Sequence, residues 1–270
     1  MKYSVAIAPW ALDTAPVLYR GDIYQSAEKI KSAGYDAIEI HIKEPSQIDS
    51  EKLQDYCQKT GLEVSAFATG MANVIDKLSF IDDSQEIRDK AVERVMDFVK
   101  LASKFKAGVI LGSIRGNIPD KSNRAKYDNR FYDCMSRILD VAEEKNVKIF
   151  LEAINRYENN YLNTAEETLE YIKPLDSDKL LVHLDTFHMN IEEADMAEAI
   201  KLCGDKLGYI HVADNNRKYV GAGAIDFSKV FVAAKSIGYN GFLSLECLPL
   251  PDPETAIVKT MIKLKSISSV

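Results

Sequence analysis

Residues 180–185 read LLVHLD, a nearly continuous apolar stretch that ends in a carboxylate. Three other stretches are also nearly continuously apolar: YSVAIA at 3–8, GVILG at 108–112 and KIFLEA at 148–153. Strands of a parallel sheet have this composition, because helices cover the sheet and both faces of each strand are buried. The four stretches therefore predict a parallel sheet covered by helices.

Eight strands are expected along the chain, and segments with helical periodicity lie between them. The expected strands are residues 3–8, 37–42, 63–68, 108–112, 148–153, 180–185, 208–213 and 241–246. The clearest helical pattern runs from residue 85 to residue 105, with apolar side chains recurring every three or four positions. A glycine in a left-handed conformation often ends a helix. Four glycines before strands are assigned this role: Gly34, Gly61, Gly108 and Gly238.

Alternating strands and helices leave two architectures, a closed (β/α)8 barrel and an open doubly wound sheet. The open sheet usually carries a glycine-rich phosphate loop after its first strand. Here residues 8–13 read APWALD, which contains no glycine. The strand count and the length of 270 residues fit the barrel. We therefore predict an α/β protein with one (β/α)8 TIM-barrel domain spanning residues 1–270.

The composition argues against several classes of protein. The chain has 34 Lys and Arg against 41 Asp and Glu, a net charge of −7 that disfavours nucleic acid as a partner. It has no apolar run of about 18 residues, so no membrane span is expected, and its first residues do not resemble a signal peptide. The cysteines show no paired spacing, which favours reduced thiols in a cytoplasmic protein. They are Cys57, Cys134, Cys203 and Cys247.

Each of the last four expected strands carries an ionisable residue at or near its end. These residues are Glu152, Asp185, His211 and Glu246. Because active sites of such barrels lie at the carboxyl ends of the strands, we expect the four side chains to meet. Burying three carboxylates and an imidazole together is costly unless they bind a cation. The donor set favours one divalent metal, Mn²⁺, Mg²⁺ or Co²⁺, with Zn²⁺ also open.

Further polar residues are expected at the same rim of the barrel. Glu158 follows the fifth strand, His188 follows the sixth and Arg217 follows the seventh. Their side chains could hydrogen-bond a polyhydroxylated substrate. His183 shares a strand face with the carboxylate of the sixth strand, and we expect it to support the site or pack in the core. His41 ends the second strand and is assigned to the opposite wall.

Four segments together resemble the sugar isomerase/epimerase superfamily, which has a xylose-isomerase-like barrel. They are LEAINRYE at 151–158, HLDTFHMNIEE at 183–193, HVADNNR at 211–217 and LSLEC at 243–247. Within that superfamily the pattern is most similar to ketose 3-epimerases of the D-tagatose/D-psicose (allulose) 3-epimerase group.

The resemblance implies a metal-dependent carbohydrate epimerase that inverts C3 of a ketose through a cis-enediolate. It implies that one divalent ion, with Mn²⁺ favoured, is held by Glu152, Asp185, His211 and Glu246. It implies that Glu158, His188 and Arg217 contact the sugar. Since inversion needs an acid/base on each face of a planar intermediate, Glu152 and Glu246 are the expected catalytic pair. A homodimer or homotetramer is expected for this group.

Other functions stay open on the sequence. The same superfamily contains aldose–ketose isomerases of the hydroxypyruvate and rhamnose isomerase types, and epimerases of modified keto-sugars. An AP-endonuclease-like nuclease is a distant alternative, because its trinuclear metal site needs more than the four histidines of this chain. The net charge also opposes binding to a polyanion. A non-catalytic metal-binding or sugar-binding protein is the last alternative.

Overall fold

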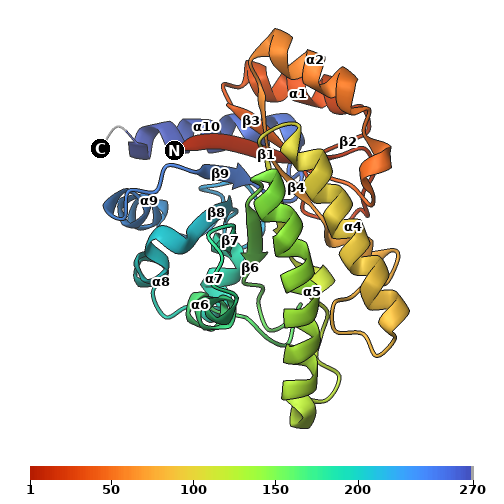
Figure 1. Ribbon diagram of the computed structural model, residues 1–270. Coiled ribbons are helices and arrows are strands. Elements are labelled where there is room, and N and C mark those ends of the chain that lie inside the picture. The colour runs from red at the N-terminus through yellow and green to blue at the C-terminus, as the bar shows by residue number, and fades with distance from the viewer. Residues whose placement is uncertain (269–270) are drawn as a thin grey trace.

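The computed structural model describes residues 1–268, and these form a closed parallel barrel (Figure 1). The strands are β1 (Lys2–Ala8), β2 (Tyr19–Arg20), β3 (Ala37–His41), β4 (Glu63–Ala68), β5 (Gly108–Leu111), β6 (Ile149–Glu152), β7 (Leu180–Asp185), β8 (Leu207–Val212) and β9 (Phe242–Leu245). Their order is β2-β1-β3-β4-β5-β6-β7-β8-β9, and pairing of β1 with β9 closes the ring. The two-residue β2 pairs with the end of β1, so eight strands make the barrel wall.

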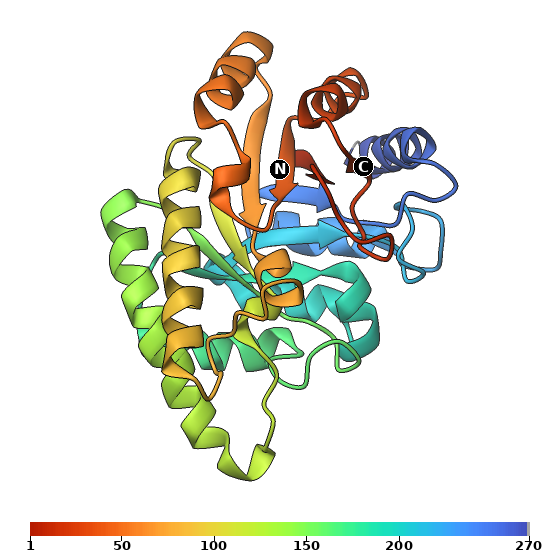
Figure 2. The same cartoon turned by 90° about the vertical axis from the view of Figure 1, so that its right-hand side faces the viewer.

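Helices connect the parallel strands and lie outside the barrel (Figures 1 and 2). They are α1 (Ile23–Ser32), α2 (Ser50–Thr60), α3 (Gly70–Val74), α4 (Gln85–Ser103), α5 (Arg124–Lys145), α6 (Ala165–Ile172), α7 (Thr186–Glu192), α8 (Met196–Cys203), α9 (Phe227–Ser236) and α10 (Pro253–Ser268). The two longest, α4 and α5, run side by side along one flank. The connections after β4 and β7 each carry two helices, a short one and then a longer one.

The predicted barrel is confirmed, and each of the eight expected strands is present. The strands at 63–68 and 180–185 have the predicted bounds, and the others differ by one residue at one end or at both ends. The sequence prediction missed β2. The predicted domain extends to residue 270. Its last two residues, 269 and 270, lie outside the described part of the chain.

The glycine prediction holds at three positions and is wrong at the fourth. Left-handed φ values occur at Gly34, Gly61 and Gly238. Gly108 instead begins β5, and Lys106 has the positive φ of 55° in that turn. A Cβ on Gly108 would lie 2.1 Å from the Phe150 ring. Glycine is therefore needed at this position because an aromatic side chain from the neighbouring strand fills the space.

Phe150 and Tyr209 fill the interior of the barrel beneath the carboxyl ends of the strands. Their rings stack with centroids 5.1 Å apart and pack against small and aliphatic side chains from the neighbouring strands. Alternate residues of a strand face the same side, so the residue two positions further along also faces the interior. Glu152 lies two positions after Phe150, and His211 lies two positions after Tyr209, so both ionisable side chains face the barrel interior. An apolar floor thus supports a layer of ionisable side chains.

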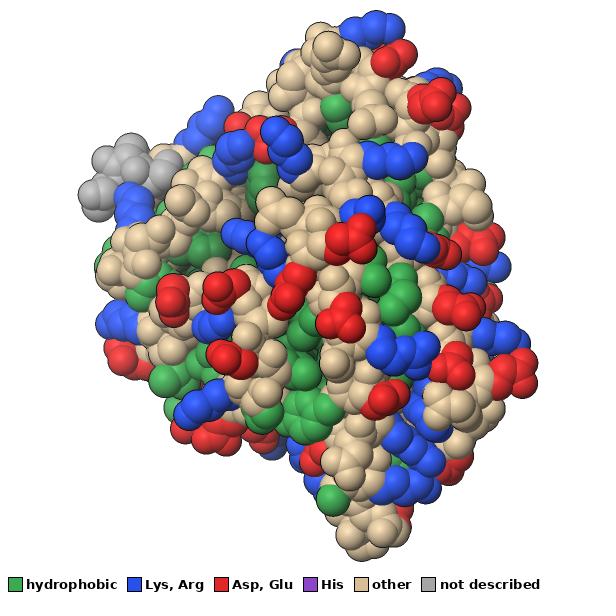
Figure 3. Space-filling model, in the orientation of Figure 1, with side chains coloured by type: hydrophobic (Ala, Val, Ile, Leu, Met, Phe, Trp, Pro, Cys, Tyr) green, Lys and Arg blue, Asp and Glu red, His purple; other side chains and the backbone are tan. Residues whose placement is uncertain are grey.

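The outer surface carries mixed charge. Figure 3 shows acidic and basic side chains interspersed over one face, with apolar side chains between them. Within residues 1–268, no helix has both the length and the apolar character that crossing a membrane requires.

Candidate active site

The four residues predicted as metal ligands lie together at the carboxyl ends of their strands. Glu152 and Asp185 are the last residues of β6 and β7, His211 lies near the end of β8, and Glu246 follows β9. All four are buried, and one ligand atom from each lies within 4.8 Å of the others. The fold therefore brings together side chains that are up to 94 positions apart in the sequence.

The imidazole of His211 faces the three carboxylates with one nitrogen. Its Nδ1 atom lies 3.3 Å from Oε2 of Glu246 and 3.8 Å from oxygens of Glu152 and Asp185. This nitrogen is buried and makes no hydrogen bond. Buried polar atoms are normally satisfied, and three carboxylate oxygens with one imidazole nitrogen suit a divalent cation. The residues present thus fit the metal that the sequence pattern predicts.

Arg217 lies against the same carboxylates. Its guanidinium group donates to Asp185 and to Glu246, and it stacks over the ring of Phe187 with 4.7 Å to the centroid. The backbone of Arg217 has a φ of 58°, which is uncommon for a residue other than glycine and is found at functional sites. The carboxylate of Asp214 holds the surrounding loop by accepting backbone hydrogen bonds.

The environment separates the pKa values of the two glutamates. Burial, together with the charges of Glu246 and Asp185, raises the pKa of Glu152 to about 8. Burial also acts to raise the pKa of Glu246, but the positive charges of His211 and Arg217 lower it to about 2. Carboxyl groups with pKa values pushed apart are typical of sites where one group holds a proton and another is ionised.

Asn155, which was not predicted from the sequence, links two of the predicted substrate-binding residues. Its Nδ2 atom lies 2.6 Å from Nδ1 of His188 and donates to Oε1 of Glu158 at 2.9 Å. An amide nitrogen is a donor, so Nδ1 of His188 accepts and the ring proton is assigned to Nε2. That nitrogen lies 3.8 Å from Glu152. Burial lowers the pKa of His188, so the neutral ring presents a donor to the site.

The four histidines of the chain all lie at this end of the barrel. His41 lines the hollow, as expected from its position at the end of the second predicted strand. His183 is fully buried, and its ring packs edge-on against His211 with centroids 4.1 Å apart. Glu39, a fully buried carboxylate on β3 beside His41, was not predicted from the sequence. Its signal in the sequence was an ionisable residue inside the apolar strand AIEIH.

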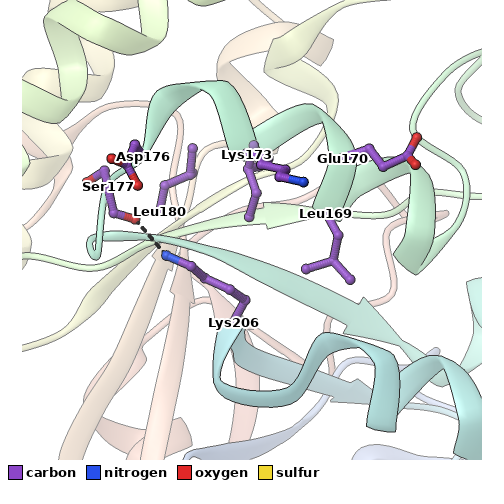
Figure 4. A pocket seen from close by; sticks show the side chains of 8 residues that line it. Leu169, Glu170, Lys173, Asp176, Ser177, Leu180 and Lys206 are labelled. Carbon is purple, nitrogen blue, oxygen red and sulfur yellow. Dashed lines mark hydrogen bonds between the residues drawn. The ribbon is translucent and has the colours of Figure 1, made fainter.

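The hollow above the charged cluster has a cavity volume of about 150 Å³. Apart from the ionisable residues, its wall includes Pro16, Ala68, Gly70, Ile110, Ser113 and Ile154. A larger hollow of about 330 Å³ lies beside Leu180, at the start of β7 and hence at the opposite end of the barrel (Figure 4). There Lys206 donates to the backbone oxygen of Ser177. The smaller hollow is the candidate active site, because the ionisable cluster lines it.

A parallel barrel whose ionisable side chains gather at the carboxyl ends of its strands is an enzyme architecture. Comparison with known proteins identifies the family. The chain belongs to the Xylose isomerase-like TIM barrel family, which matches residues 27–267.

Several relatives of known activity are similar over most of the chain. The L-ribulose 3-epimerase of Methylomonas sp. (strain DH-1) is 35% identical over 215 residues, which cover 79% of this chain and 74% of the relative. The 3-dehydro-D-guloside 4-epimerase of Escherichia coli (strain K12) is 28% identical over 83% of this chain and 87% of the relative. The crystal structure of D-allulose 3-epimerase from Methylomonas sp. in complex with D-allulose has a TM-score of 0.83 at 25% identity, with 98% of this chain and 96% of that chain covered. The relatives place this chain among isomerase-class carbohydrate epimerases, as the resemblance implied.

Proposed function

We propose that the protein is a metal-dependent ketose 3-epimerase. The observation that carries this proposal is the buried cluster of three carboxylates around the Nδ1 atom of His211, which makes no hydrogen bond, in a chain related to ketose 3-epimerases. Glu152, Asp185, His211 and Glu246 would hold one divalent cation, with Mn²⁺ as the first choice and Co²⁺ or Mg²⁺ as alternatives. When bound, the cation would act as a Lewis acid that makes the proton beside the sugar carbonyl more acidic.

Glu152 and Glu246 are the proposed acid/base pair. They come from strands separated by two others, so their carboxyl groups can approach the sugar from different sides. One glutamate removes the proton at C3, and the other returns a proton to the opposite face of the planar intermediate, which inverts the carbon. Asp185 is proposed to serve the cation alone, because its Oδ1 atom accepts a hydrogen bond from the backbone of Phe187 and is held by it.

The remaining site residues are proposed to bind the sugar. His188 presents its Nε2 proton toward the cluster and would donate to a sugar oxygen near the reacting carbon. Glu158, held by Asn155, would accept from a hydroxyl group. Arg217 would stabilise negative charge on the carbonyl side of the substrate, since it already contacts two carboxylates.

A direct test is the identity of the product. The Mn²⁺-loaded protein is incubated with L-ribulose and D-allulose, and the sugars are separated by chromatography. We expect the C3 epimer of at least one ketose and no aldose. An aldose product would instead assign the chain to the aldose–ketose isomerases.

One relative supports a second candidate. Because the E. coli 4-epimerase acts on 3-dehydro-D-guloside, this chain could act on a modified keto-sugar with the same metal site and the same pair of glutamates. The same incubation with a 3-keto-glycoside separates the two candidates. Inversion at C4 of the glycoside without reaction of the free ketoses would favour the second one.

Two further properties are proposed. We propose a homodimer or homotetramer, as in the resembling group, and light scattering at the monomer mass of 30.2 kDa would contradict it. We also propose a cytoplasmic location, which the four unpaired cysteines support.

Metal binding is expected to strengthen as the pH rises toward about 8. Glu152, whose pKa is raised to about 8, must lose its proton before it can bind a cation. The pKa of His211 is also raised well above its ordinary value, because the neighbouring carboxylates outweigh its burial, so it too must release a proton. Each released proton raises the apparent affinity by up to about tenfold per pH unit. Calorimetric Mn²⁺ titrations in two buffers of different ionisation enthalpy measure the protons released, and an affinity independent of pH would contradict the prediction.

A further inference from the structure

Glu39 is a fully buried carboxylate at the centre of a polar cluster inside the barrel. Its two oxygens lie 2.9 and 3.1 Å from Nε2 of His211, and one of them lies 2.5 Å from Nε2 of His41. The hydroxyl group of Tyr209 donates to Glu39 at 2.8 Å. Within residues 1–268, the ion pairs of Glu39 are with these two histidines.

A carboxylate in this position is costly to bury, so its contacts need an explanation. An ionised group inside a protein destabilises the fold unless charged partners and hydrogen bonds compensate for its lost hydration. Glu39 contacts no lysine or arginine among the hydrogen bonds and ion pairs of the described chain. A neutral apolar residue at this position would avoid the cost.

The contact of Glu39 with His211 determines which ring nitrogen faces the carboxylate cluster. An ionised carboxylate only accepts hydrogen bonds, so the ring nitrogen beside Glu39 must carry a proton. Because Nε2 is that nitrogen, Nδ1 is left without a hydrogen bond and faces Glu152, Asp185 and Glu246.

We propose that Glu39 is a positioning residue that accepts the Nε2 proton of His211 and thereby presents Nδ1 to the divalent cation. Imidazole ligands commonly have such a carboxylate partner, which fixes both the tautomer and the ring orientation. The inference rests on the proposed metal site and adds a residue that does not line the hollow above the charged cluster. It assigns His211 to the metal through Nδ1 rather than through Nε2.

The test measures Mn²⁺ binding rather than turnover. Metal-free wild-type protein, Glu39→Gln and Tyr209→Phe are titrated with Mn²⁺, and free Mn²⁺ is followed by electron paramagnetic resonance. Tyr209→Phe is the matched control, because it also removes a hydrogen bond of Glu39 but leaves the contact with His211. We expect Glu39→Gln to bind Mn²⁺ about 10- to 100-fold more weakly, the usual cost of losing such a partner, and Tyr209→Phe to bind close to the wild-type value.

A second measurement needs no variant and therefore does not depend on whether Glu39→Gln folds. Wild-type protein with ¹⁵N-labelled histidine is loaded with Zn²⁺, and long-range ¹H–¹⁵N spectra identify the protonated nitrogen of His211. We expect the proton on Nε2 and the metal shift on Nδ1.

The outcomes separate this inference from the proposed function. Equal Mn²⁺ affinity in Glu39→Gln and wild-type protein, or a proton on Nδ1 in the loaded protein, would overturn the role of Glu39 and leave the metal site in place. Equal weakening in Tyr209→Phe and Glu39→Gln would overturn it as well, because the effect would then come from the polar cluster as a whole. Wild-type protein that binds neither Mn²⁺ nor Zn²⁺ would overturn both the inference and the proposed metal-dependent function.

Discussion

Replacing Glu246 with glutamine is expected to slow C3 epimerisation by at least about 100-fold, and replacing Glu152 is expected to have a similar effect. Glutamine keeps the size of the side chain but cannot accept or return a proton. Because each epimer would lose its proton to a different glutamate, either replacement should block reaction in both directions. The rate is measured with substrate and with product as starting material, at a Mn²⁺ concentration that saturates each variant.

The saturating metal matters because both glutamates are also proposed ligands. Bound Mn²⁺ is therefore quantified in each variant, so that loss of the acid/base can be distinguished from loss of the cation. Glu63→Gln serves as the matched control, since Glu63 begins β4 at the other end of the barrel and pairs with Lys2. Substantial turnover by either metal-loaded site variant would contradict a scheme with two glutamate acid/bases.

Removing the metal is expected to abolish epimerisation and to lower the melting temperature. A ligand at about 100 times its Kd stabilises the fold by about 2.7 kcal/mol. For a chain of this size, that corresponds to a melting temperature higher by roughly 5–10 °C in the loaded protein. Chelator treatment followed by calorimetry, with and without added Mn²⁺, measures the shift.

Asp185→Asn is the informative variant for this experiment. It removes one carboxylate charge from the cluster and leaves both proposed acid/bases in place, so the Mn²⁺-dependent shift should shrink. An unchanged melting temperature and full activity after chelation would show that the cluster does not hold a metal that the reaction needs.

The fold could be predicted because its strands differ in composition from everything around them. Buried parallel strands such as residues 180–185 are mostly apolar and are buried on both faces, so the sequence predicts their bounds to within a residue at each end. The site followed from the fold, since Asp185 and Glu246 stand where apolar strands end. In a barrel those ends converge.

Other features could not be predicted because they depend on side chains that meet across the barrel. Asn155 lies in the segment after β6 and contacts His188 in α7, after β7. This contact cannot be predicted without knowing the direction in which each side chain points. The requirement for Gly108 comes from Phe150, which is distant in sequence. Glu39 lies in the middle of a strand, whereas the general rule for such barrels predicts site residues at the strand ends.

The central claim, that the protein removes and returns the proton at C3 of a ketose, is tested most directly by hydrogen exchange. The Mn²⁺-loaded protein is incubated with a panel of ketoses in D₂O, and the C1 and C3 protons are followed by NMR. We predict loss of the C3 signal, no loss at C1, and full retention of both signals after chelation. Exchange at C1 with an unchanged C3 signal would contradict the account, because it would mean that the proton moves between C1 and C2.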